Sequence, residues 1–194
     1  MSHAAAAGWQ DIDESEMLRA WALAEVTSST SPMQQAPDFD PVREKLRAGG
    51  ADTLTPADWQ LLERGIRWAR EPILGPLLAL RPRWYRAHLP VEVLADARTI
   101  GFPLFVAKAP SRRLAALCAA EGHPGAAPGE FRREAMTAPP ILVGVTLEGP
   151  WCLAEGYRRC CRAIRDQQAE CFDGLPLPVI VGVGPEMARW TWWR

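Results

Sequence analysis

The chain has 194 residues, of which 48% are hydrophobic and 23% are charged, close to the proportions of an ordinary globular protein. These proportions exclude a fibrous or wholly disordered chain. The 22 Lys and Arg residues against 23 Asp and Glu residues give a formal net charge of -1, which argues against non-specific attraction to nucleic acid or anionic lipid.

No targeting or membrane segment is expected. Residues 1–8 lack a basic region followed by an apolar run, and the residues after them are acidic, unlike a signal peptide. The longest apolar stretch, residues 73–80, is interrupted by Gly75 and Pro76 and is far shorter than the roughly 20 residues of a membrane helix. The five cysteines are an odd number with no Cys-x-x-Cys pair, so the sequence predicts no disulfide framework and a reducing, cytoplasmic location.

Residues 1–50 differ in composition from the rest of the chain. A Ser/Thr cluster at residues 27–31 is followed by prolines and by Gly49-Gly50, which predicts a mostly flexible arm. Within it, residues 14–26 carry apolar side chains at three- and four-residue steps, which predicts one helix with Ser15 as its cap. We expect that helix to dock on the body of the protein or on a partner.

Residues 51–87 are predicted to form a helical extension. The segment Thr55-Pro56-Ala57-Asp58 combines a hydroxyl cap, a first-turn proline and an early carboxylate, so a helix should begin there and bury a face that includes Trp59 and Trp68. It should end at Glu71-Pro72. Three arginines beside two aromatic residues follow at residues 81–86; we interpret them as arginine stems lying on exposed rings, with a ligand-binding role as the alternative.

Residues 88–194 are predicted to form the main domain. Its first part should contain short strands at residues 90–94 and 100–107 and a helix over residues 111–120 capped by Ser111, followed by a Gly/Pro-rich break. The later part has the clearest pattern: a strand at residues 140–145, a turn and a second short strand predict a hairpin. A helix after Gly156 and a strand over residues 177–183 should complete an α+β fold.

The turn at Gly156 is the candidate site. A glycine between a strand and a helix permits a sharp turn and leaves the first helical amides open to an anion, which the helix dipole also favours. Arg158 and Arg159 occupy the first turn, where acidic residues are normally preferred, so an oxyanion is the ligand that would compensate them. The alternative is that both arginines pair with Glu155 or point to water.

The residues around this turn resemble the ParB N-terminal domain and sulfiredoxin superfamily, over roughly residues 88–183. Its members place a Gly-x-x-Arg turn between a hairpin and a helix: partition proteins carry Gly-Glu-Arg-Arg and bind CTP, sulfiredoxins carry Gly-Cys-His-Arg and bind ATP, and free serine kinases carry Asp-Gly-His-His-Arg. The family's glycine maps onto Gly156, its final arginine onto Arg159, and the partition proteins' first arginine onto Arg158. The resemblance implies a bound nucleotide, ATP or CTP with Mg²⁺, or another phosphorylated small molecule.

Two departures limit what the resemblance implies. Tyr157 stands where sulfiredoxins have cysteine, so sulfur reduction by that route is not expected, and Cys160 and Cys161 are expected to pack as small apolar residues. About eleven residues follow Val183, too few for a helix-turn-helix region, so specific DNA binding is not expected.

The candidate ligand-binding residues are Glu155, Gly156, Tyr157, Arg158 and Arg159, with Arg98 and Lys108 approaching from earlier segments. Phosphoryl transfer or nucleotide hydrolysis is the expected reaction class if there is turnover. A catalytic carboxylate is left open among Glu92, Asp96 and Glu155. The three histidines have no metal-ligand spacing, and no Gly-x-Ser-x-Gly nucleophile motif occurs.

Two other functions remain as alternatives. A non-catalytic interaction scaffold is favoured by the Trp-rich C-terminus, residues 187–194. We expect these residues to bury against the protein's own body, on the face that receives Trp59 and Trp68, or else to anchor a protein partner or a second copy in a homodimer. A nuclease or single-strand binder is disfavoured by the near-neutral charge.

Overall fold

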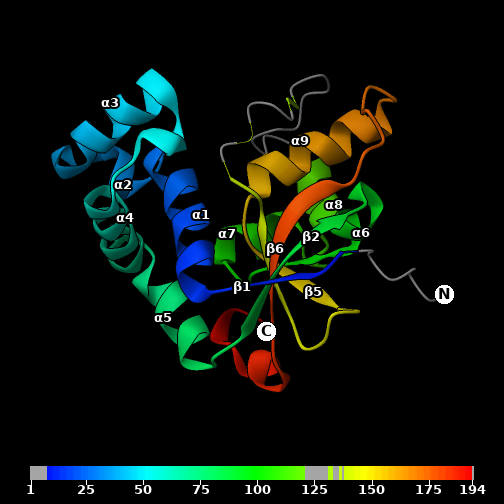
Figure 1. Cartoon of the computed structure of the whole chain (residues 1–194). Coiled ribbons are helices and arrows are strands. Elements are labelled where there is room, and N and C mark those ends of the chain that lie inside the picture. The colour runs from blue at the N-terminus through cyan, green and yellow to red at the C-terminus, as the bar shows by residue number, and fades with distance from the viewer. Residues whose placement is uncertain (1–7, 121–130, 133–135, 137, 194) are drawn as a thin grey trace. The chain divides into compact units, whose positions relative to one another are not determined.

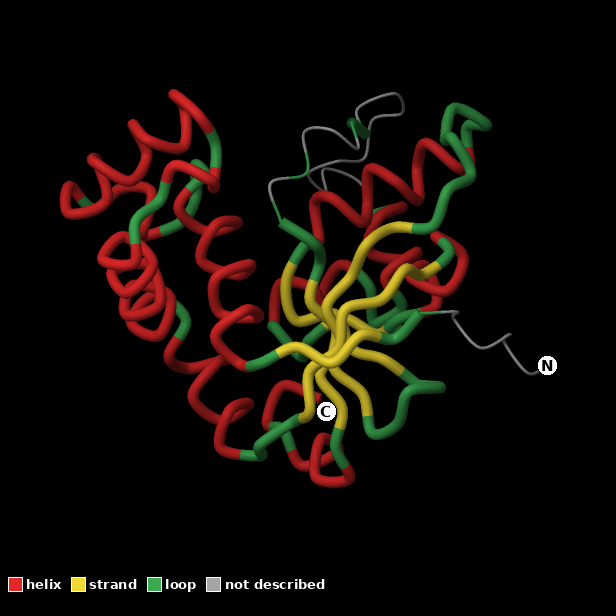
Figure 2. The backbone as a smooth tube through the Cα atoms, viewed as in Figure 1, coloured by secondary structure: helices red, strands yellow, loops and turns green. Residues whose placement is uncertain are grey.

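The computed structural model describes residues 8–120, 131, 132, 136 and 138–193. The chain divides into two compact units: a helical unit, Asp13–Ala79, and a sheet unit formed by Met1–Ile12 together with Leu80–Arg194. The predicted mixture of helices and strands is confirmed, because the described residues combine helices with one six-stranded mixed sheet (Figures 1 and 2). The predicted Gly/Pro-rich break and the piece around residues 131–136 lie largely outside the described residues.

The helical unit contains five α-helices and two 3-10 helices. They are α1 (Glu14–Val26), α2 (Pro32–Gln35), η1 (Pro37–Phe39), α3 (Asp40–Gly49), η2 (Ala51–Thr53), α4 (Pro56–Ala69) and α5 (Glu71–Ala79). The predicted span of α1 is confirmed, although its cap is Asp13, whose carboxylate accepts the Glu16 amide at 2.7 Å, and not Ser15.

Helix α4 begins where the sequence predicts. Thr55 and Asp58 form a capping box, in which each side chain accepts the other residue's backbone amide. Leu62 and Ile66 are fully buried, which confirms the predicted apolar face. Trp68 is 63% exposed, so its predicted burial is wrong; two residues beyond Ile66, it lies on the opposite side of the helix.

The segment predicted as a mostly flexible arm contains ordered helices between residues 32 and 49. Ser31 caps α2 by accepting the Met33 amide at 3.2 Å. The buried guanidinium of Arg43 donates to the carbonyls of Met33 at 2.9 Å and Ala36 at 3.2 Å. These hydrogen bonds satisfy the ends of short helices, a non-local effect that Pro- and Gly-rich composition does not reveal.

The sheet unit holds six strands in the order β1-β2-β6-β4-β5-β3. They are β1 (Gln10–Ile12), β2 (Arg83–Leu89), β3 (Arg98–Thr99), β4 (Ile141–Gly144), β5 (Trp151–Glu155) and β6 (Leu177–Val183). Strands β4 and β5 pair antiparallel, which confirms the hairpin, and β6 runs parallel to β4.

One face of this sheet packs against three helices. These are α6 (Val91–Asp96), α8 (Leu114–Ala119) and α9 (Tyr157–Gln168), which lie close together in Figure 1. The shared core takes alternate residues of the strands, such as Ala87, Leu142 and Leu153, because alternate side chains point to the same face.

Two predicted strands are helices in the structure. Residues 90–94 belong mostly to α6, where Val91 and Leu94 are buried at the three-residue spacing of a helix face. Residues 103–108 form α7 (Pro103–Lys108), which begins at a proline, a residue favoured in a helical first turn. In addition, α8 starts at Leu114, and Ser111 is not its N-cap. Arg83 does lie over the Tyr85 ring, as the interpretation of residues 81–86 expects.

The Trp-rich end forms the 3-10 helices η4 (Pro185–Arg189) and η5 (Thr191–Trp193). Trp190 and Trp193 are buried, and the Trp192 carbonyl accepts the Gly101 amide at 3.0 Å and the Arg112 guanidinium at 3.2 Å. The tail is therefore tied to the sheet unit, as expected for burial on the protein's own body.

Asp58 links the start of α4 to α3. Its carboxylate accepts hydrogen bonds from Lys45 at 2.7 Å, from the Thr55 hydroxyl at 2.6 Å and from the Thr55 amide at 2.8 Å. These donors, Lys45 first, lower the pKa of Asp58 to about 2.

We therefore predict that Asp58→Asn lowers the thermal stability at neutral pH. Because the pKa is depressed in the folded state, the contribution is complete above the ordinary pKa of 3.8 and is lost as the pH falls through about 2. Thermal unfolding followed by circular dichroism between pH 7 and pH 2.5 should show the wild type and variant converging. The matched control is Asp52→Asn, at an exposed position. A difference in thermal stability between the wild type and Asp58→Asn that does not change with pH would contradict the lowered pKa of Asp58.

Candidate oxyanion site at the start of helix α9

Gly156 makes the turn between β5 and α9 in a conformation that other residues rarely adopt. Its φ of 100° and ψ of 18° are left-handed. A Cβ atom added there would lie 2.8 Å from Pro140 Cβ and 2.9 Å from Pro140 Cα. Both the backbone angle and the neighbouring proline therefore require glycine, and the close approach to Pro140 has no signal in the sequence.

The helix that follows starts without a side-chain cap. Among the described residues no side chain forms a capping hydrogen bond at Gly156, and the first turn of this 12-residue helix carries no acidic residue. The first N–H groups of an α-helix have no acceptor within the helix itself, and the helix dipole adds partial positive charge there. This end of α9 therefore has the chemistry that favours an anion.

The two arginines of the first turn have different surroundings. Arg159 forms an ion pair with Glu155, and both side chains are less than one-fifth exposed. Arg158 is exposed. The alternative of pairing with Glu155 thus holds for Arg159, so the guanidinium of Arg158 is the better placed of the two to meet a ligand from solvent.

Tyr157 holds the start of α9 against neighbouring elements through its side chain. Its hydroxyl donates to the Leu153 carbonyl and accepts the Ile100 amide at 3.1 Å, and its ring lies 4.5 Å from the Phe105 ring of α7. Burial raises the pKa of Tyr157 well above its usual value, so the phenol stays protonated. Only the backbone amide of Tyr157 is then suited to a ligand.

Arg98 and Lys108 lie in different places relative to the Gly156 turn. Arg98 pairs with Cys152, four residues before Gly156, which is roughly 13 Å along a strand. Lys108 is exposed at the end of α7, the helix whose Phe105 contacts Tyr157. Lys108 thus lies on an element next to the site, whereas Arg98 lies towards the other end of β5.

The three candidate carboxylates are all engaged. Glu155 pairs with Arg159, Asp96 lies 3.2 Å from Arg113, and Glu92 accepts a hydrogen bond from Gln167. Glu92 and Asp96 are on α6, and Glu155 precedes the turn directly. We assign a catalytic role to none of them.

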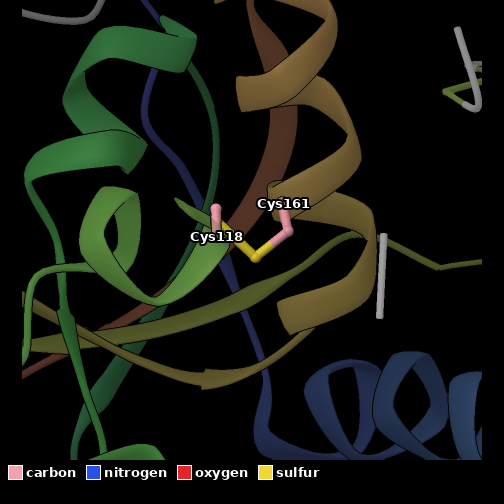
Figure 3. The surroundings of a disulfide bond; sticks show 2 residues. All are labelled: Cys118 and Cys161. Carbon is pink, nitrogen blue, oxygen red and sulfur yellow. A yellow bond between two sulfur atoms is a disulfide. The ribbon is translucent and has the colours of Figure 1, made fainter. Parts of the chain in front are cut away.

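The cysteines differ from the prediction in one respect. Cys160 is buried, and burial raises the pKa of its thiol to about 12, which confirms an apolar packing role. Cys161, however, forms a disulfide with Cys118 that joins α9 to α8 (Figure 3). The expectation that Cys161 packs as a free, small apolar residue is therefore wrong, and the chain forms a disulfide although no disulfide framework was expected. Two helices packed on one sheet face bring together residues 43 apart in sequence.

Within the described part of the chain, no group of three or more His, Cys, Asp or Glu side chains is placed to hold a metal ion, and no helix is long and apolar enough to cross a membrane. Comparison of this chain with family models, with curated proteins and with solved structures gives no match.

We predict that Gly156→Ala destabilises the protein by about 3 kcal/mol, because it adds both left-handed strain and a clash with Pro140. Gly174→Ala is the matched control: its φ is +72° and nothing lies within 4 Å of an added Cβ, so it should cost only about 1–2 kcal/mol. Urea unfolding followed by circular dichroism measures both. Equal costs at the two positions would show that the contact with Pro140 is not tight.

Proposed function

We propose that the start of α9 binds the phosphate group of a nucleotide or of another phosphorylated small molecule. The observation that carries the proposal is the left-handed Gly156 at the N-terminus of a 12-residue helix, uncapped by any described side chain and without an acidic residue in its first turn. The amides of Tyr157 and Arg158 would contact the phosphate oxygens, as backbone N–H groups do at helix N-termini.

Charge at the turn supports an anionic ligand. Glu155 pairs with Arg159 and offsets its positive charge. The exposed Arg158 therefore adds a positive charge that Glu155 does not offset. A guanidinium recognises phosphate through two parallel hydrogen bonds. In this proposal Arg159 orients the turn and Arg158 neutralises the ligand, with Lys108 on α7 as a further nearby cation.

Membership of the ParB and sulfiredoxin superfamily is part of the proposal. It is supported by the order of elements around the glycine: strand β4, hairpin strand β5, Gly156, helix α9 and strand β6. On this basis ATP or CTP, with Mg²⁺ bound to the nucleotide, are the ligands to test first, and phosphoryl transfer or nucleotide hydrolysis is the reaction class. We also propose a cytoplasmic location.

The second candidate is a protein-interaction scaffold, which one surface favours. Phe102 and Leu104, at the start of α7, are 41% and 55% exposed, and the Trp192 ring lies 6.4 Å from Phe102. Trp190 and Trp193 are buried, so Phe102 and Leu104 are the exposed apolar side chains of this surface that would meet a protein partner or a second copy of the chain. Aromatic side chains of this kind are enriched in interface centres.

We predict that ATP, CTP or GTP, tested with and without Mg²⁺, raises the midpoint of thermal unfolding by a few degrees, because a ligand that binds only the folded state stabilises it. Isothermal titration calorimetry should then show that Arg158→Ala weakens binding by about tenfold, the usual effect of losing a hydrogen bond to a charged group. Arg64→Ala, which removes another exposed helical arginine in the helical unit, is the matched control and should leave the affinity unchanged.

Three results would redirect the interpretation. No stabilisation by any nucleotide or by inorganic phosphate would refute the phosphate site. Capture of a protein partner that survives Arg158→Ala but is lost with Phe102→Ala would favour the scaffold. A salt-sensitive shift of single-stranded DNA would instead support a nucleic-acid binder.

A further inference from the structure

The Cys118–Cys161 disulfide lies close to the candidate site and on the helix that forms it. Cys161 is in the second turn of α9, five residues after Gly156, and Cys118 is next to the last residue of α8. Figure 3 shows the bond crossing between the two helices. We propose that this bond is a redox-controlled clamp that holds the start of α9 in place when oxidised and loosens it when reduced.

The clamp acts through packing. Both cysteines are 1% exposed or less, and they lie in the same core as Leu114 and Leu117 of α8 and Ile164 of α9. Two thiols need more room than two bonded sulfurs, and a close-packed core has no spare volume to provide it. Reduction must therefore move α8 and α9 relative to each other or change the rotamers at their contact.

Helix α8 depends on these contacts more than most helices. It has six residues, a length at which an isolated helix is not stable in water. Besides the disulfide, α8 is attached by the buried side chains Leu114 and Leu117, by the partly buried Ala116 and by a 2.8 Å hydrogen bond from the Leu114 amide to the Ala97 carbonyl. Loss of the disulfide therefore removes the covalent link between this short helix and α9 and leaves α8 held by packing and hydrogen bonding.

The neighbouring thiols do not compete for the bond. Cys160 and Cys152 are buried, and burial raises the pKa of each thiol to about 12. Thiol–disulfide exchange requires a thiolate, which neither residue forms at neutral pH. Cys171 is exposed and follows the end of α9. The pairing of Cys118 with Cys161 is thus the one that persists.

The chemistry is a reversible two-electron exchange. Because Cys118 and Cys161 are themselves buried, the exchange takes place when the short helix α8 opens locally and exposes their sulfurs. Oxidation then removes two electrons and two protons from the two thiols and forms the sulfur–sulfur bond; a small-molecule disulfide such as glutathione disulfide accepts them and leaves as two thiols. Disulfides in reducing compartments are usually transient and often redox-sensing. A cytoplasmic location, as proposed, is therefore consistent with a bond that forms on oxidation.

The first test counts thiols and measures the mobility of α9. Full-length protein is equilibrated with glutathione disulfide or with dithiothreitol, then denatured, alkylated and weighed by mass spectrometry. We expect alkylation of the three free cysteines in the oxidised sample and of all five in the reduced one. Hydrogen–deuterium exchange of folded protein should show the amides at residues 160–164, which are hydrogen-bonded within α9, exchanging at least roughly 5-fold faster after reduction. A roughly 5-fold change is the lower end of the usual range for coupling between two sites.

The second test links the clamp to the ligand, and this part rests on the proposed function. Affinity for ATP and for inorganic pyrophosphate should fall by roughly 5-fold or more on reduction. Cys118→Ser should behave as the reduced protein in either buffer, and Cys171→Ser, at an exposed free cysteine, should keep the full redox response.

The outcomes separate the two ideas. Five alkylated cysteines after treatment with glutathione disulfide, or equal exchange at residues 160–164 in both states, would overturn the clamp whatever the ligand results are. No binding of either anion in either state would refute the phosphate site, while the exchange rates would still decide whether the clamp exists.

Discussion

The close approach of Gly156 to Pro140 is the constraint on which the candidate site depends. Strand β5 must turn into α9 within one residue while passing the start of β4, and the space left is smaller than a methyl group. A left-handed glycine meets both conditions. Because the turn is so short, the first amides of α9 follow directly after the strand, and the Arg159–Glu155 pair bridges the turn from one side to the other.

Polar interactions around this turn have different roles. The Tyr157 hydroxyl joins β5 to the chain after β3 by bonding to the Leu153 carbonyl and the Ile100 amide, so a buried polar group is satisfied and the helix start is fixed. Arg158 makes no comparable structural contribution from its exposed position. Some residues thus position the turn, whereas Arg158 faces solvent. This arrangement is consistent with an anion site at the start of α9.

Sulfur and apolar packing govern the next part of the same helix, at Cys160 and Cys161. Cys160 and Cys161 are consecutive, yet one remains a buried thiol and the other is bonded to α8. Neighbouring residues on a helix point in directions about 100° apart, so only one of them can meet a given partner. The disulfide and the candidate anion site thus lie on the same helix, so a change at the sulfurs is expected to reach the backbone amides of that helix.

Local patterns in the sequence determined the elements whose signals are short-range. The span of α1, the capping box of α4, the hairpin of β4 and β5, the glycine turn and the strand β6 all follow from caps, turn residues and apolar runs that lie within a few positions of one another. The glycine, the uncapped helix start and the first-turn arginines of the candidate site were visible for the same reason.

Only the tertiary structure decided the features that depend on residues far apart in the chain. Arg43 satisfies carbonyls seven and ten residues away and so orders a segment whose composition is typical of a flexible arm. The Cys118–Cys161 bond, the contact of Gly156 with Pro140 and the pairing of β3 with β5 join segments separated by many residues. Periodicity and caps report what a segment prefers by itself, whereas these contacts arise from how packed elements meet, which no local pattern encodes.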